Sequence, residues 1–128
     1  MSFLLDTHIL LWAAGTPDRL PTDTRLLVEN PATELIFSAA SLWEVAIKNS
    51  LARADFNVDV RLLRRKLLEN GYTELAVTSA HAVAVGSLPP IHKDPFDRIL
   101  VAQAQVEMVT LLTADEIVGR YPGPVRVI

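Results

Sequence analysis

The sequence contains no cysteine, no long apolar run and no excess of basic residues. The absence of cysteine excludes disulfide bonds and thiolate metal sites. The apolar stretches are far shorter than the roughly 18 residues that span a bilayer, and no basic segment precedes the first of them. We therefore expect a cytoplasmic protein without a membrane anchor.

The composition is that of a compact protein. Half of its 128 residues are apolar and 21% are charged, which predicts a single domain over residues 1–128. The net charge of −3 argues against a broadly basic nucleic-acid-binding surface. Setting aside the four acids discussed below leaves 11 acidic residues against 12 Lys and Arg. An acidic site on a nearly neutral body is compatible with a phosphate-bearing ligand, provided that a cation bridges them.

Apolar strands alternate with amphipathic helices along the chain. The strands are predicted at residues 3–5, 34–38, 73–77, 109–112 and 125–128. The helices are predicted from residue 7 to the turn at residue 15, and at residues 21–29, 39–51, 59–70, 79–87, 95–107 and 114–120. This alternation predicts a three-layer α/β/α fold with a mainly parallel, five-stranded sheet, whose ligands bind beyond the carboxyl ends of the strands.

Acidic residues recur where these elements join. Asp6 and Asp115 follow predicted strands, whereas Glu44 and Asp97 lie near the beginnings of predicted helices. Three or four carboxylates brought close together repel one another, and a divalent cation relieves that cost. Because the candidate ligands are all carboxylate oxygens, the cation should be hard, namely Mg²⁺ or Mn²⁺.

Each acid also has an ordinary structural interpretation. Asp6 could cap the helix that begins at Thr7. Glu44 could complete a capping box with Ser41 or pair with Lys48 one turn later. Neither role explains why carboxylates recur along one predicted edge, because Ser, Thr or Asn also serve as caps.

The same holds for the acids of the C-terminal third. Asp94 precedes Pro95 and is expected to cap the helix, supporting the site without binding metal. Asp97 complements the positive end of that helix. Asp115 lies early in a predicted helix that Thr113 could cap.

The chain resembles PIN domains, and more narrowly the VapC-type toxins of bacterial toxin–antitoxin pairs. The motifs that carry the resemblance span most of the chain: Leu-Leu-Asp-Thr-His at 4–8, Ser-Leu-Trp-Glu at 41–44, Asp-Pro-Phe-Asp-Arg-Ile-Leu-Val-Ala-Gln-Ala at 94–104, and Leu-Leu-Thr-Ala-Asp at 111–115. The third motif is the most specific of them.

This resemblance implies a Mg²⁺- or Mn²⁺-dependent endoribonuclease. The acidic positions of the family correspond to Asp6, Glu44, Asp97 and Asp115, and Thr7 would form a hydrogen bond near the metal. It also implies an RNA substrate, a homodimer, and a small antitoxin whose C-terminal segment occupies the groove.

Other polar residues are weaker candidates. Arg98 could balance the acidic groove or stabilise transition-state charge. His8 is interpreted mainly as a helix-surface residue, and residues 92–93 could either contact RNA phosphate or remain solvated. The basic residues of helix 61–66 most simply form a solvated face.

Two other functions remain open. One is a receiver-type phosphoacceptor module, which shares the size and the α/β alternation. It requires an acidic pair after the first strand and a Lys on a late strand, and the sequence has neither. The other is a protein that acts mainly as a non-catalytic binding partner.

Overall fold

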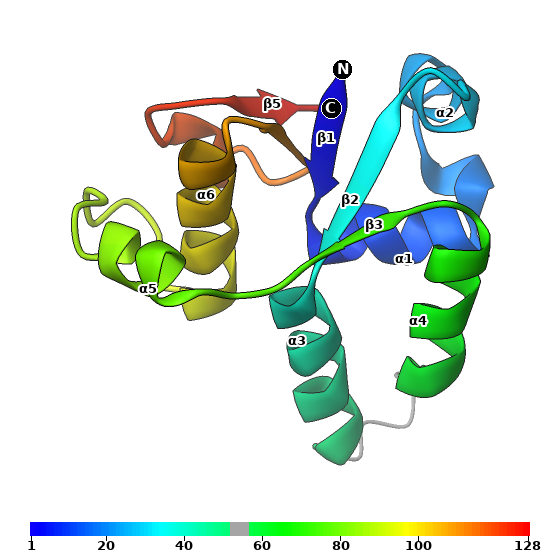
Figure 1. Cartoon of the computed structure of the whole chain (residues 1–128), viewed down its shortest axis with the longest axis horizontal. Helices are drawn as coiled ribbons and strands as arrows, with labels where there is room; N and C mark the ends of the chain where they lie inside the picture. Colours follow the sequence, from blue (N-terminus) through cyan, green and yellow to red (C-terminus); the bar gives the residue numbers. More distant parts are fainter. Residues whose placement is uncertain (52–56) are drawn as a thin grey trace.

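The computed structural model describes residues 1–51 and 57–128 (Figure 1). Its strands are β1 (Ser2–Leu5), β2 (Glu34–Ser38), β3 (Thr73–Leu75), β4 (Thr110–Thr113) and β5 (Val125–Val127). Its α-helices are α1 (Thr7–Gly15), α2 (Thr22–Glu29), α3 (Ala39–Ser50), α4 (Val60–Glu69), α5 (Ser79–Val85) and α6 (Pro95–Glu107). Two 3₁₀-helices complete the described elements, η1 (Pro17–Arg19) and η2 (Val118–Arg120).

The five strands form one parallel sheet in the order β3-β2-β1-β4-β5, as the alternation predicted. Leu4 of the central strand β1 is in register with Ile36 on one side and Leu111 on the other. The chain builds outward from β1 to β3, then crosses back to place β4 on the other side of β1. The strand order therefore reverses between β1 and β4, which is where sheets of this kind bind ligands.

Both faces of the sheet are covered. Phe3 and Leu5 of β1 face a core that includes residues of α1, α3 and α4, whereas Leu4 faces a second core formed largely by α6. Successive side chains of a strand point to opposite faces, so an uninterrupted apolar run is buried on both sides. Figure 1 shows α5 and α6 on one side of β1 and β2, with α1, α2 and α4 on the other.

Several predicted elements end earlier in the structure, and one is of a different type. The strand predicted at 73–77 ends at Leu75, and the helix predicted at 114–120 is wrong. Only residues 118–120 are helical, as the 3₁₀-helix η2. Asp115 instead accepts a hydrogen bond from the Ile117 N–H at 2.8 Å, which closes a local turn where the helix was expected to begin.

The helices are short relative to a membrane. The longest helix in residues 1–51 and 57–128 is α6, with 13 residues, and none in these ranges is long and apolar enough to span a bilayer.

Candidate metal-binding site

Asp6 and Asp115 lie at the carboxyl ends of the two strands that flank the reversal of strand order. Asp6 extends the pairing of β1 through its N–H, which donates to the Leu112 carbonyl of β4 at 3.0 Å. Its side chain caps α1 by accepting from the Ile9 N–H at 2.9 Å. The capping interpretation of Asp6 is therefore correct, and it coexists with a position at the ligand-binding edge.

Asp94 and Asp97 both lie at the beginning of α6. Asp94 caps the helix, with its Oδ1 accepting from the Phe96 N–H at 2.8 Å, and Pro95 occupies the first helical position. Both features were predicted. Asp97 lies in the first turn, where the helix dipole favours a negative charge.

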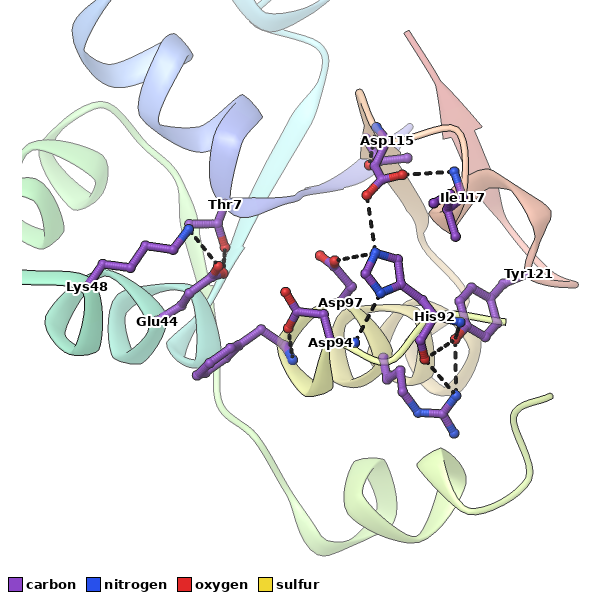
Figure 2. Close-up of polar contacts among 12 residues, drawn as sticks. Thr7, Glu44, Lys48, His92, Asp94, Asp97, Asp115, Ile117 and Tyr121 are labelled. Atoms are coloured by element: carbon purple, nitrogen blue, oxygen red, sulfur yellow. Dashed lines mark hydrogen bonds and ion pairs between the residues drawn. The ribbon is translucent and has the colours of Figure 1, made fainter. Parts of the chain in front are cut away.

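Glu44 is buried on α3 and both of its carboxylate oxygens are engaged (Figure 2). The Thr7 hydroxyl donates to Oε1 at 2.6 Å, and Lys48 Nζ lies 3.0 Å from Oε2. The predicted pairing with Lys48 is thus confirmed. The predicted capping box with Ser41 is wrong, because Ser38 caps α3 and places Ser41 within its first turn.

His92 lies between two of the acids (Figure 2). Its Nε2 is 3.3 Å from Asp115 Oδ2 and 3.4 Å from Asp97 Oδ2. The ring belongs to the loop that precedes α6. Sequence reasoning gave this histidine only a possible phosphate contact, and its place among the carboxylates was not predicted.

These residues surround one pocket of about 370 Å³. All four predicted acids line it, together with the predicted supporting residues Thr7 and Asp94. His8, Trp12, Lys48, His92 and Ala114 complete the lining. The pocket therefore collects carboxylates from four separate segments of the chain.

Burial and mutual repulsion change the acidity of these groups. Burial raises the pKa of Asp97 to about 7, and the charges of Asp94, Asp6 and Glu44 add to the rise while His92 opposes it. Burial also raises the pKa of Asp6, although hydrogen bonds from Ile9 and Thr113 oppose the change. Both shifts disfavour the ionised carboxylates, and a bound cation would stabilise them.

Asp115 differs because hydrogen bonds stabilise its charged form. Desolvation would raise its pKa, yet the hydrogen bonds from the Ile117 N–H and from His92 hold that pKa below its ordinary value. Its Oδ1 accepts the backbone bond, and its Oδ2 faces His92. Asp115 is thus ionised and oriented.

The donor set fits a hard divalent cation. One oxygen each of Asp97 and Asp115 and one nitrogen of His92 lie within 4.8 Å of one another, the only such potential metal group in residues 1–51 and 57–128. Asp6 lines the same pocket. Carboxylate oxygens suit Mg²⁺ and Mn²⁺, and a cation would favour the ionised form of Asp97, whose pKa is raised first by burial and then by the neighbouring acids.

Two other predictions have different outcomes. Arg98 was expected to balance the groove or to stabilise transition-state charge, and its guanidinium donates to the Pro89 carbonyl at 3.1 Å and to the Val85 carbonyl at 3.3 Å. In the basic helix, Arg64 pairs with Glu74 at 2.8 Å on the exposed surface, in line with a solvated face.

The fold and site together define a three-layer α/β protein with an acidic centre at the edge of its sheet. The model of the PIN domain family matches residues 3–124. Ribonuclease VapC22 from Mycobacterium tuberculosis is 31% identical over 126 residues, which cover 97% of this chain and 96% of that protein. The chain therefore belongs to the PIN domain family, as a relative of the VapC type.

Solved structures share the fold. The VapBC2 complex of Rickettsia felis, bound to a DNA fragment from its promoter, contains a chain that matches with a TM-score of 0.71 at 19% identity, covering 99% of this chain and 98% of that chain. VapBC-1 from nontypeable Haemophilus influenzae matches with a TM-score of 0.63 at 16% identity and the same coverage. The receiver interpretation is excluded by the family match.

Proposed function

We propose that this protein is a VapC-type ribonuclease, the toxin of a toxin–antitoxin pair, and that it cleaves RNA phosphodiester bonds with the help of Mg²⁺ or Mn²⁺. The observation that carries the proposal is the meeting of Asp6, Glu44, Asp97 and Asp115 in one pocket, where burial, together with the nearby negative charges, raises the pKa of Asp97 to about 7. The identity of 31% to Ribonuclease VapC22 supports the assignment to RNA.

Each acid has a proposed role. Asp6, Asp97 and Asp115 hold the cation, and Asp94 supports them by fixing the beginning of α6. A bound divalent cation supplies positive charge that neutralises the developing charge on phosphoryl oxygens and makes a water more acidic. Glu44 either binds a second cation or orients the attacking water and accepts its proton.

The contacts of Glu44 support a fixed orientation for its carboxylate. The Thr7 hydroxyl and the Lys48 ammonium hold one oxygen each, so the group is aimed before substrate binds. Preorganisation of this kind removes the cost of reorienting a catalytic group during the reaction.

The activity test is cleavage of a single-stranded RNA by the purified protein. We expect cleavage with Mn²⁺ or Mg²⁺, loss of cleavage with EDTA, and loss of cleavage in Asp6→Asn. If the wild-type protein bound RNA but did not cleave it with either Mn²⁺ or Mg²⁺ present, the proposal would be refuted. Lys66→Gln, on the exposed basic helix, is the matched control that should retain cleavage.

The partner proposals are an antitoxin and a second copy of the chain. The two solved structures named above are VapBC complexes, which supports a small antitoxin as the partner. Expression of the wild-type protein should arrest growth, and Asp6→Asn should abolish the arrest while it still co-purifies with the antitoxin. Light scattering of the isolated protein tests the homodimer.

A further inference from the structure

The loop that carries His92 is fastened to the body of the protein through its backbone. The buried Tyr121 hydroxyl accepts from the His92 N–H at 2.8 Å and lies 3.3 Å from the His92 carbonyl. Arg98 Nη1 donates to the same hydroxyl at 3.0 Å and to the Pro89 carbonyl at 3.1 Å. The pair formed by Tyr121 and Arg98 thus fixes the loop at His92 itself. Figure 2 shows Tyr121 beside His92.

The imidazole of His92 is held in one tautomer. The Asp94 N–H lies 3.0 Å from His92 Nδ1. A backbone N–H can only donate, so Nδ1 must act as the acceptor and carries no proton. The ring proton therefore lies on Nε2.

The protonated Nε2 points at the acidic site. It lies 3.3 Å from Asp115 Oδ2 and 3.4 Å from Asp97 Oδ2. A nitrogen that carries a proton has no lone pair for a metal, but it can donate to a carboxylate. Hydrogen bonds of this kind orient carboxylate ligands around metal ions.

We propose that His92 is a hydrogen-bond donor that orients Asp97 and Asp115, not a metal ligand, and that Tyr121 and Arg98 are positioning residues that hold it in place. The inference rests on the proposed function for the role of the two carboxylates. It gives Arg98 a different task from direct stabilisation of the acidic groove, because its contacts reach the site only through the loop.

The first test reads the tautomer directly by long-range ¹H–¹⁵N NMR of the imidazole rings in the full chain. We expect a protonated Nε2 and an unprotonated Nδ1 for His92, both unchanged when Mg²⁺ saturates the site. Loss of the Nε2 proton on addition of Mg²⁺, or a proton found on Nδ1, would overturn the inference. This readout needs no RNA, so it is independent of whether the protein cleaves.

The second test exchanges the side chain and measures Mn²⁺ affinity by calorimetry alongside cleavage. We expect His92→Ala to weaken both by about 10–100-fold. His92→Gln retains an N–H donor, so its Mn²⁺ affinity and cleavage should be close to those of the wild type. His92→Glu has a carboxylate that can bind metal but no N–H donor, so it should be as impaired as His92→Ala. Recovery by His92→Glu instead of His92→Gln would assign His92 as a ligand.

The third test removes the positioning hydroxyl. Tyr121→Phe keeps the buried ring but loses the contact with the His92 backbone, and we expect about a 10-fold loss of Mn²⁺ affinity. Tyr72→Phe, at a half-buried ring on the opposite face of the sheet, is the matched control and should change nothing. Equal behaviour of the two variants, with the His92 NMR signals unmoved in Tyr121→Phe, would reject the positioning role while leaving the nuclease proposal intact.

Discussion

His81 and His92 are held in the same way but face different surroundings. Each Nδ1 accepts a backbone N–H, from Thr78 in one case and from Asp94 in the other, both at 3.0 Å. In both residues Nε2 faces a carboxylate group. His81 is fully buried and its Nε2 lies 2.8 Å from one carboxylate, that of Glu107, whereas Nε2 of His92 lies near two aspartates beside a pocket.

The difference separates a structural histidine from a functional one. At His81 one donor meets one acceptor, and the ring completes a capping box that begins α5. At His92 one donor is shared by two carboxylates, and Asp6 and Glu44 add further negative charge nearby. In the first arrangement the carboxylate is paired within the chain, whereas the second gathers negative charge that a bound cation would neutralise.

The largest expected effect is on RNA cleavage, and it distinguishes Asp97, a partner of His92, from Glu107, the partner of His81. Asp97→Asn should lower kcat/KM for RNA by more than about 100-fold, because it removes a charge that we propose holds the cation. Glu107→Gln changes the partner of His81 at the other end of α6 and should leave cleavage unchanged. A comparable loss in both variants, measured with the same RNA and Mn²⁺, would contradict the distinction.

The next effect is on stability and belongs to His81. Glu107→Ala leaves the buried Nε2–H of His81 without its acceptor, which should cost about 1–3 kcal/mol of unfolding free energy. Urea denaturation measures the change. The loss should be the same with and without Mn²⁺, since this pair lies outside the pocket; a metal-dependent loss would count against a purely structural role.

Asp97→Asn should increase the free energy of unfolding when metal is absent, whereas Glu107→Ala decreases it. The substitution removes a half-buried charge whose pKa is raised to about 7, and its side chain is 22% exposed. After allowance for solvent screening, we expect a gain of about 1 kcal/mol in EDTA. Mn²⁺ should stabilise the wild type and leave Asp97→Asn nearly unchanged. Asp18→Asn, at an exposed side chain, is the control for removing a negative charge.

The smallest expected effect is the pH dependence of the stability that Asp97→Asn gains over the metal-free wild type. The folded pKa of Asp97 is about 7 and its ordinary value is 3.8, so between these values the folded state holds a proton that the unfolded state has lost. The stability of the metal-free wild type should therefore fall as the pH rises toward 7. The advantage of Asp97→Asn should grow from pH 5 to pH 8, and an advantage that shrinks over this range would contradict the assignment.

Local chemistry made much of this fold predictable. Uninterrupted apolar runs identified the strands, and the caps at Asp6 and Asp94 could be inferred because each helix begins directly after them. The pairing of Glu44 with Lys48 follows from helical spacing alone. The turn at Asp115 could not be inferred, because an Asp beside a predicted helix serves equally well as a cap or as a turn.

The position of His92 was beyond sequence reasoning for a different reason. The path of its loop depends on the hydroxyl of Tyr121, 29 residues further along the chain. The same hydroxyl is bound by Arg98, at a separation of 23 residues. No local pattern records contacts of this kind, so a histidine among carboxylates looked the same as one in solvent.

Residues far apart in the sequence meet at the reversal of strand order, and this has a consequence for synthesis. Asp115 and Tyr121 are added to the chain more than a hundred residues after Asp6. A nascent chain that ends at α6 lacks β4, and with it the partner strand beside Asp6. Translation therefore finishes most of this toxin before the ribosome carries anything able to cut RNA.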